Sequence, residues 1–247
     1  DPETPGGHWK ESPMRVRQAL TLLAVALTGA LIAPSAAQAM TPKDVSPDNS
    51  IQIIGGNTVS SAPWAVAVFR DGSFTCSGSI IASRWVLTAR HCVGGNTMQV
   101  RVGSVNRTSG GTVANVTEAY ARFDIALLRL DRNVSASYVQ LANSNPPVGS
   151  TNTIYGWGMT CYSGCGASVQ LKTASVRVTS TSVSDAYGGQ AIRSTRINGN
   201  AWRGDSGGPQ FYNGQQVGVA STANGVDIQN YSSIAYNRAW IRSVSGV

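Results

Sequence analysis

The sequence predicts an all-β fold, either a barrel or a sandwich, and three observations support this prediction. Many short segments are rich in β-branched residues, glycine-containing turns separate them, and long helical periodicity is missing before the C-terminus. A single helix is expected over residues 234–244. The expected strands, in chain order, cover residues 64–69, 78–83, 84–89, 98–103, 125–130, 152–158, 174–180 and 215–221.

The N-terminal region is predicted to contain an export signal. Arg15 and Arg17 form a basic start, an apolar run follows over 19–33, and Ala37-Gln38-Ala39 has the small-x-small pattern of a cleavage site. The alternative is a membrane anchor, but the run is shorter than the roughly 18 apolar residues that a spanning helix needs. Residues 14–39 are therefore assigned to a signal peptide, which predicts a secreted, extracellular product with no membrane attachment after signal removal.

The remaining segments complete the predicted organisation. Residues 1–13 resemble neither a signal peptide nor part of a folded domain. They are taken as a leader that is non-native or that results from a mis-set start of the chain. Residues 40–52 are polar and contain two prolines, and they are expected to be a propeptide. Residues 53–247 have the length of one domain, or of two small lobes that share an interface.

The charge distribution argues against a nucleic-acid partner. The formal net charge is +7 at pH 7, but the basic residues are scattered along the chain rather than gathered in runs. No RNA-binding signature is present. Residues 101–117 lack the acidic side chains of a calcium loop, and neither a metal nor another cofactor is predicted.

The four cysteines are expected to form disulfides, which are the default in an exported chain. Three pairings are possible, and the favoured one joins Cys76 to Cys92 and Cys161 to Cys165. Metal binding by these cysteines is the weaker alternative, because the chain has no C-x-x-C pair and only one histidine follows residue 53.

Three residues have the chemistry of a nucleophile, a general base and an orienting acid. Ser206 lies in the glycine-dense stretch RGDSGGPQ, His91 follows an apolar strand, and Asp124 leads into another one. A serine hydroxyl needs an adjacent base, a histidine titrates near neutral pH, and a carboxylate holds the imidazole in one tautomer. Each residue also has a structural interpretation, as part of a surface turn, as a buried histidine or as a strand-start acid.

The order of these residues along the chain separates two folds. Gly204-x-Ser206-x-Gly208 also fits the nucleophile turn of α/β-hydrolases, but that fold requires a histidine after the serine. No histidine follows Ser206, and the order His, Asp, Ser is the chymotrypsin-type order.

The sequence resembles the trypsin/chymotrypsin family of secreted serine proteases. The resemblance implies two six-stranded antiparallel β-barrels, a C-terminal helix and an active site between the barrels. The short leader suggests a bacterial source. The matching motifs occur in family order and are IIGG (53–56), PWAV (63–66), CSGSIIASRWVLTARHC (76–92), DIALLRL (124–130), GWG (156–158) and GDSGGP (204–209).

The resemblance also implies roles for individual residues. His91 is the expected base, Asp124 the orienting acid and Ser206 the nucleophile. The backbone N–H groups of Gly204 and Ser206 are the expected oxyanion hole. Ser221 matches the position that supports the buried aspartate and begins the edge that pairs with the substrate backbone.

The resemblance further implies an activation step. In the family, cleavage before an IIGG-type start frees an amine, which pairs with the aspartate that precedes the serine. Here the pair is expected to be Ile53 and Asp205, so the chain is expected to be a zymogen that is cut after Gln52. Without that cation, a buried carboxylate would be strongly unfavourable.

The specificity pocket departs from the family pattern. Asn200 occupies the position that is aspartate in trypsins, so a preference for Arg or Lys is not expected unless Asp227 supplies the charge. Arg203 at the rim is an alternative determinant and would favour acidic groups. Thr222 and Ala223 replace the common Trp-Gly wall. A neutral or apolar side chain before the scissile bond is the favoured expectation.

The resulting hypothesis is a secreted serine endopeptidase that hydrolyses peptide bonds through an acyl-enzyme. Protein or peptide substrates are the expected partners, a protein protease inhibitor is a further candidate partner, and a monomer is expected. The alternative is a non-catalytic binding protein on a serine protease fold. The presence of all three triad residue types favours the enzyme.

Overall fold

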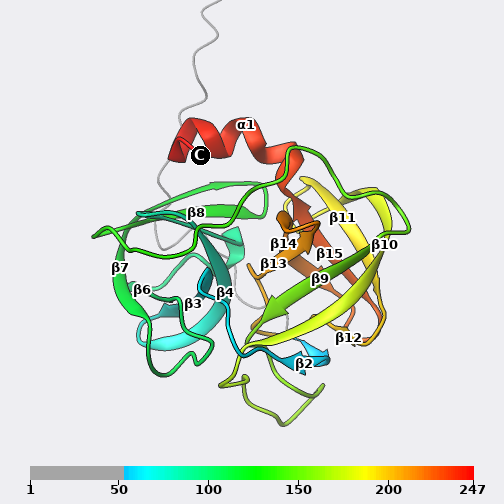
Figure 1. Cartoon of the computed structure of the whole chain (residues 1–247), viewed down its shortest axis with the longest axis horizontal. Helices are drawn as coiled ribbons and strands as arrows, with labels where there is room; N and C mark the ends of the chain where they lie inside the picture. Colours follow the sequence, from blue (N-terminus) through cyan, green and yellow to red (C-terminus); the bar gives the residue numbers. More distant parts are fainter. Residues whose placement is uncertain (1–52) are drawn as a thin grey trace, which may run out of the picture. The chain divides into compact units, whose positions relative to one another are not determined.

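Two antiparallel β-barrels make up residues 53–247, the part of the chain that this computed structural model describes (Figure 1). The predicted leader, signal peptide and propeptide (residues 1–13, 14–39 and 40–52) lie outside the described residues. The expected fold, with two six-stranded barrels and a C-terminal helix, is confirmed for residues 53–247.

The first barrel is the closed ring β3-β4-β5-β8-β7-β6. Ile125, Leu127 and Leu128 of β8 are fully buried, because one face of this strand fills the barrel and the other is covered by packed elements. The strands of this barrel are β3 (Ala65–Arg70), β4 (Ser73–Ala82), β5 (Trp85–Thr88), β6 (Met98–Val102), β7 (Thr112–Arg122) and β8 (Ile125–Leu130).

The second barrel is the ring β11-β15-β14-β13-β9-β10, which a further pairing between β10 and β11 closes. Ile154 and Tyr231 are fully buried in its core. The strands are β9 (Thr151–Gly156), β10 (Lys172–Ser184), β11 (Gln190–Arg196), β13 (Pro209–Tyr212), β14 (Gln215–Ala223) and β15 (Ile228–Ser233).

The start of the described chain is fastened to the second barrel. Strand β1 (Ile54–Gly55) pairs with β12 (Gly199–Asn200), and β2 (Asn57–Thr58) extends the sheet at the edge of β10. Gly56 has a φ of 59°, and a Cβ atom there would collide with the carbonyl oxygen of Thr173. The second glycine of IIGG is therefore required by this close approach.

The C-terminal helix α1 (Ile234–Ser245) has a well-defined start and end. The Ser233 hydroxyl accepts a hydrogen bond from the Tyr236 N–H and caps the N-terminus. Gly246, in the left-handed region at φ 81°, donates its N–H to Arg242 O and ends the helix. Ile234 and Ile241 of this helix pack into the core cluster of the first barrel. Among the described residues, no helix is long and apolar enough to cross a membrane.

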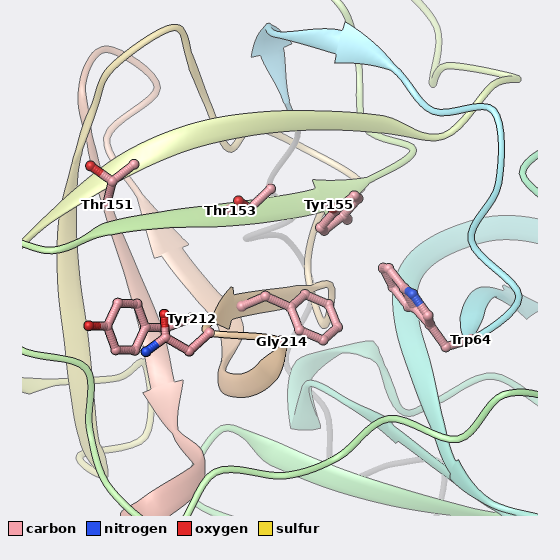
Figure 2. Close-up of a pocket in the computed structure, with 8 residues that line it drawn as sticks. Trp64, Thr151, Thr153, Tyr155, Tyr212 and Gly214 are labelled. Atoms are coloured by element: carbon pink, nitrogen blue, oxygen red, sulfur yellow. The ribbon is translucent and has the colours of Figure 1, made fainter.

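A cavity of about 370 Å³ lies beside three packed aromatic rings (Figure 2). The rings of Trp64 and Tyr155 meet edge to face at a centroid distance of 5.0 Å, and Phe211 packs against both. None of the predicted site residues lines this cavity. The other lining residues are Thr151, Thr153, Tyr212, Asn213 and Gly214.

Candidate active site

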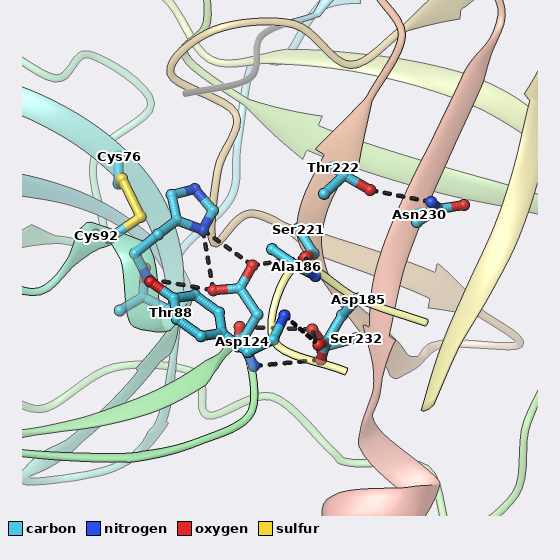
Figure 3. Close-up of polar contacts among 12 residues, drawn as sticks. Cys76, Thr88, Cys92, Asp124, Asp185, Ala186, Ser221, Thr222, Asn230 and Ser232 are labelled. Carbon is cyan, nitrogen blue, oxygen red and sulfur yellow. Dashed lines mark hydrogen bonds and ion pairs between the residues drawn. A yellow bond between two sulfur atoms is a disulfide. The ribbon is translucent and has the colours of Figure 1, made fainter. Parts of the chain in front are cut away.

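His91 lies in the short 3-10 helix Arg90–Cys92, directly after β5. The disulfide between Cys76 and Cys92 fixes the adjacent backbone to β4. The Nδ1 atom of His91 lies 2.9 Å from both carboxylate oxygens of Asp124 (Figure 3). A ring that donates from Nδ1 leaves Nε2 as the basic nitrogen. The Nε2 atom is buried and finds no hydrogen-bond partner among residues 53–247.

Asp124 is fully buried, and several donors converge on its carboxylate. Its Oδ1 also accepts the backbone N–H of His91 at 3.1 Å, and its Oδ2 accepts the hydroxyl of Ser221 at 2.5 Å. A buried carboxylate is stable only with such partners. The contacts therefore hold both the carboxylate and the imidazole in one orientation.

Ser206 lies in the turn before β13, where the second barrel meets the first. It is fully buried, and its carbonyl oxygen accepts the backbone N–H of Ser77 in β4 at 2.9 Å. The next residue, Gly207, packs so closely on Thr88 and Ala89 that a Cβ atom would lie 2.8 Å from Ala89 N. Ala89 is two residues before His91, so the predicted nucleophile turn and the predicted base are held together across the barrel junction.

Gly204 begins this turn with a φ of 100°, which side chains rarely allow. Its carbonyl oxygen accepts the Ser77 hydroxyl at 2.9 Å, and that hydroxyl accepts the Trp157 N–H at 3.1 Å. The Ser77 side chain thus fixes the peptide between Gly204 and Asp205. This peptide lies between the two N–H groups, of Gly204 and Ser206, that are the expected oxyanion donors.

The trypsin family model matches residues 53–241. The chain belongs to the trypsin family. Trypsin delta of Drosophila erecta is 36% identical over 230 residues, which cover 81% of this chain and 91% of the relative. Trypsin alpha of Drosophila melanogaster is 35% identical over 234 residues, which cover 83% of this chain and 91% of the relative. Membership of this family makes the chain a serine endopeptidase. The relatives are insect proteins, so the expected bacterial source is not supported.

Solved structures agree with the trypsin-family fold. Neuropsin, a serine protease from mouse brain, matches with a TM-score of 0.67 and 26% identity, over 77% of this chain and 98% of neuropsin. A scabies mite inactivated protease paralogue matches with a TM-score of 0.70 and 24% identity, over 78% of this chain and 97% of the paralogue. The second likeness concerns the fold alone.

The residues predicted to form the specificity pocket include a buried, neutral group. Asn200 is 1% exposed, and its Oδ1 atom has no hydrogen-bond partner among residues 53–247. Gln229 of β15 is also buried; its Oε1 accepts the Ala201 N–H at 3.2 Å and its Nε2 donates to Ser194 O at 2.9 Å. Asp227, in contrast, is exposed, and its carboxylate accepts from Asn224 in a surface turn.

The remaining predicted pocket residues lie at more exposed positions. Arg203 is exposed and stacks over the ring of Trp202, with 5.8 Å between the guanidinium carbon and the ring centroid. The Thr222 hydroxyl accepts from Asn230 at 3.0 Å, and Ala223 is the last residue of β14. Sequence reasoning missed Gln229, because a lone glutamine in a polar strand carries no motif.

Ile53 and Asp205, the predicted activation pair, are both fully buried. Ile53 packs in the apolar cluster of the second barrel, whereas Asp205 accepts the N–H groups of Gly158 and Trp202 at 3.0 and 3.1 Å. Burial raises the pKa of Asp205 well above its usual value. No ion pair within residues 53–247 includes this carboxyl group.

The cysteines pair as the favoured prediction states. Cys76 bonds to Cys92 and Cys161 bonds to Cys165. In residues 53–247, no group of three or more His, Cys, Asp or Glu side chains is placed to hold a metal ion.

Proposed function

We propose that this trypsin-family chain is a secreted endopeptidase that cleaves peptide bonds with Ser206, His91 and Asp124. The main observation that supports this proposal is the contact between His91 Nδ1 and the Asp124 carboxylate, with a distance of 2.9 Å to each oxygen. This contact orients Nε2 as a base and stabilises the imidazolium that forms during catalysis. The glycine-dense turn that packs Gly207 against Thr88 and Ala89 brings Ser206 to the same junction.

The proposed reaction has two halves. His91 Nε2 takes the proton of the Ser206 hydroxyl while Oγ bonds to the substrate carbonyl carbon, and the backbone N–H groups of Gly204 and Ser206 receive the oxyanion. His91 then gives the proton to the leaving amine, the C–N bond breaks, and an acyl-enzyme remains. In the second half, water loses a proton to His91, attacks the acyl carbon and releases the acid, and the proton returns to Ser206 Oγ.

The preferred substrate carries a neutral side chain before the scissile bond. Asn200 and Gln229 are buried and uncharged, whereas the exposed Asp227 is bonded to Asn224. A buried cation without a carboxylate partner is unfavourable. We therefore expect the enzyme to discriminate against Arg and Lys at this position.

Cleavage before Ile53 is proposed to activate the enzyme and to remove the propeptide 40–52. The new ammonium would have a buried carboxylate, Asp205, within the same barrel as a partner. Asp205 adjoins Gly204 and Ser206, so pairing would order the predicted oxyanion hole. Export directed by the signal peptide 14–39 is proposed to precede this cleavage.

The decisive experiment compares the full chain before and after cleavage at the Gln52–Ile53 bond. A site-specific protease that leaves Ile53 as the new N-terminus supplies the cut form, and a mixed peptide library supplies the substrates. We expect cuts only from the cut form, mostly after neutral residues, and none from its Ser206→Ala variant. Equal activity of the uncut chain would contradict the zymogen proposal.

A second experiment separates the enzyme from a binding protein on the same fold. An active-site organophosphate should label Ser206 of the cut form stoichiometrically. In the Asp124→Asn variant, the imidazole is expected to adopt the wrong tautomer, and kcat should fall by about 10⁴-fold, as in related triads. A folded, cut chain that resists labelling and cleaves nothing would favour the binding protein.

A further inference from the structure

The turn between β10 and β11, residues 185–189, contacts Asp124 of the proposed triad from the side of the second barrel (Figure 3). No motif marks this turn in the sequence. It contains a carboxylate, Asp185, which is only 6% exposed. A buried carboxylate requires an explanation, because it is costly without partners.

The two oxygens of Asp185 have different partners. Its Oδ1 accepts the N–H groups of Tyr187 and Gly189 at 2.9 and 2.8 Å, which braces its own turn. Its Oδ2 accepts the backbone N–H of Asp124 at 3.2 Å and the Ser232 hydroxyl at 2.9 Å. One oxygen therefore folds the turn, and the other holds the backbone of the proposed catalytic aspartate.

The same turn reaches the Asp124 side chain by a second route. The N–H of Ala186 donates to the Ser221 hydroxyl oxygen at 3.0 Å, and this hydroxyl donates to Asp124 Oδ2 at 2.5 Å. The donated bond orients the hydroxyl, because its oxygen is engaged as an acceptor and its hydrogen is left for the carboxylate. Adjacent residues of one turn thus constrain both the backbone and the carboxylate of Asp124.

The turn also contacts the residues that flank the triad. Tyr187 lies under the guanidinium group of Arg90, the residue before His91, at 4.3 Å from ring centroid to guanidinium carbon. At Gly189, a Cβ atom would lie 2.5 Å from the Cβ atom of Phe123, the residue before Asp124. Phe123 has a φ of 52°, a strained conformation that persists only where surrounding contacts hold it.

We propose that Asp185 is a positioning residue for the reaction: through its bond to the Asp124 N–H, it sets the geometry of the Asp124–His91 pair. This inference rests on the proposed function for its kinetic consequence, but not for its structural one. A positioned pair keeps Nε2 aligned with Ser206. Loss of an outer contact to a metal-bound histidine lowers activity about 10–100-fold, and we expect a loss of the same order here. We expect loss of the Asp185 carboxylate to lower kcat rather than to raise KM. The carboxylate bonds to its own turn, to Asp124 and to Ser232, and not to the predicted pocket residues.

The test is the Asp185→Asn variant of the full chain, cut at Gln52–Ile53 in the same way as the parent. If the amide oxygen keeps the turn contacts, the amide nitrogen faces the Asp124 N–H, and two donors oppose each other. We expect kcat per titrated active site to fall about 10–100-fold with KM nearly unchanged. The matched control is Asp71→Asn, since Asp71 Oδ1 likewise accepts two turn N–H groups, of Asn96 and Thr97, but does so in the first barrel without contacting Asp124.

A spectroscopic readout keeps the inference testable apart from activity. In a His8→Gln background, His91 is the only histidine of the chain, so ¹⁵N-histidine labelling reports a single imidazole. We expect the Nδ1 proton resonance to move in Asp185→Asn and to stay in place in Asp71→Asn. Ser232→Ala removes one Oδ2 partner, together with the longer 3.4 Å contact of that hydroxyl with Asp124 O, but leaves the turn bonds, so it should move the resonance in the same direction by less.

The outcomes separate the inference from the proposed function. Unchanged kcat and an unmoved resonance in an enzyme that still depends on Ser206 would overturn the positioning role alone. A moved resonance in a chain without Ser206-dependent activity would support the positioning contact and overturn the protease proposal. If Asp185→Asn does not fold, Ser232→Ala decides, and an unmoved resonance there overturns the inference.

Discussion

Gly207 shows how a single missing side chain lets the two barrels approach at the site. Its φ is 78°, and a Cβ atom would lie 2.5 Å from Ser77 O and 2.8 Å from Ala89 N. Both neighbours are backbone atoms of the first barrel, one in strand β4 and one directly after β5. Moving them would disturb the strand pairing, so they cannot shift without a large cost in free energy. The glycine after Ser206 is therefore a requirement of the barrel junction as well as of the turn.

We expect Gly207→Ala to lower the free energy of unfolding by about 3 kcal/mol. Left-handed backbone strain contributes about 1–2 kcal/mol, and overpacking contributes the remainder. The matched control is Gly214→Ala, since Gly214 has a φ of 74° but a Cβ atom there would have no heavy atom within 4 Å. Urea unfolding measures both variants. Equal losses would show that the contact with the first barrel contributes nothing.

Some residues of the site could be predicted from the sequence and others could not. His91, Asp124 and Ser206 could be proposed because each lies in a motif and their chain order is diagnostic. Asp185 could not, because its partner is a backbone N–H 61 positions away, and no side-chain pattern encodes such a contact. Gln229 was missed for the same reason, since its partners are the main-chain groups of Ala201 and Ser194.

At the scale of elements, strands with buried apolar faces were predictable and polar strands were not. The predicted segment 125–130 matches β8, and the predicted helix 234–244 matches α1 closely. Among the barrel strands, β7, β11, β13 and β15 were missed. The sequence of β15, IQNYSS, is mostly polar, yet Gln229, Ser232 and Ser233 are fully buried. Their hydrogen bonds form only with distant parts of the fold, such as Ser233 Oγ with Asn145 at 2.6 Å.

The two disulfides join elements of unequal importance, and their removal should differ accordingly. Cys76–Cys92 spans 16 positions and is buried beside His91, whereas Cys161–Cys165 spans 4 positions in a largely exposed loop. Loop-closure entropy predicts losses of about 3 and about 2 kcal/mol, respectively. The Cys76→Ala/Cys92→Ala variant should also lose packing in the core and lower kcat, since Cys92 anchors the backbone next to the base.

Thermal unfolding and peptide hydrolysis of the two double variants test this prediction. The Cys161→Ala/Cys165→Ala variant serves as the control, because it removes a disulfide without touching β4 or the His91 backbone. A larger loss of stability or of kcat in this control than in the Cys76→Ala/Cys92→Ala variant would contradict the assignment.

At the scale of the described molecule, the proposed site exists only where the barrels meet. His91 and Asp124 belong to the first barrel, and Ser206 and Ser221 belong to the second. Ser77 of β4 bonds to Gly204 O and Ser206 O, and Ser221 of β14 bonds to Asp124, so each barrel orients groups of the other. Neither barrel alone therefore holds a complete triad.

The pH dependence of stability should differ between the chain before and the chain after cleavage at Ile53. In the uncut chain, burial raises the pKa of Asp205 above its usual 3.8. A group with a raised folded-state pKa contributes stability that is complete below the unfolded pKa and is lost as the pH rises through the folded pKa. The uncut Ser206→Ala chain should thus lose stability as the pH rises above about 4. Its Asp205→Asn counterpart should lose less.

After cleavage, pairing with the Ile53 ammonium would lower the Asp205 pKa, and the sign of the pH dependence reverses: the stability is present above about pH 4 and is lost on acidification. Urea unfolding of both forms across this range measures the two slopes, and parallel slopes would mean that the new amine does not reach Asp205.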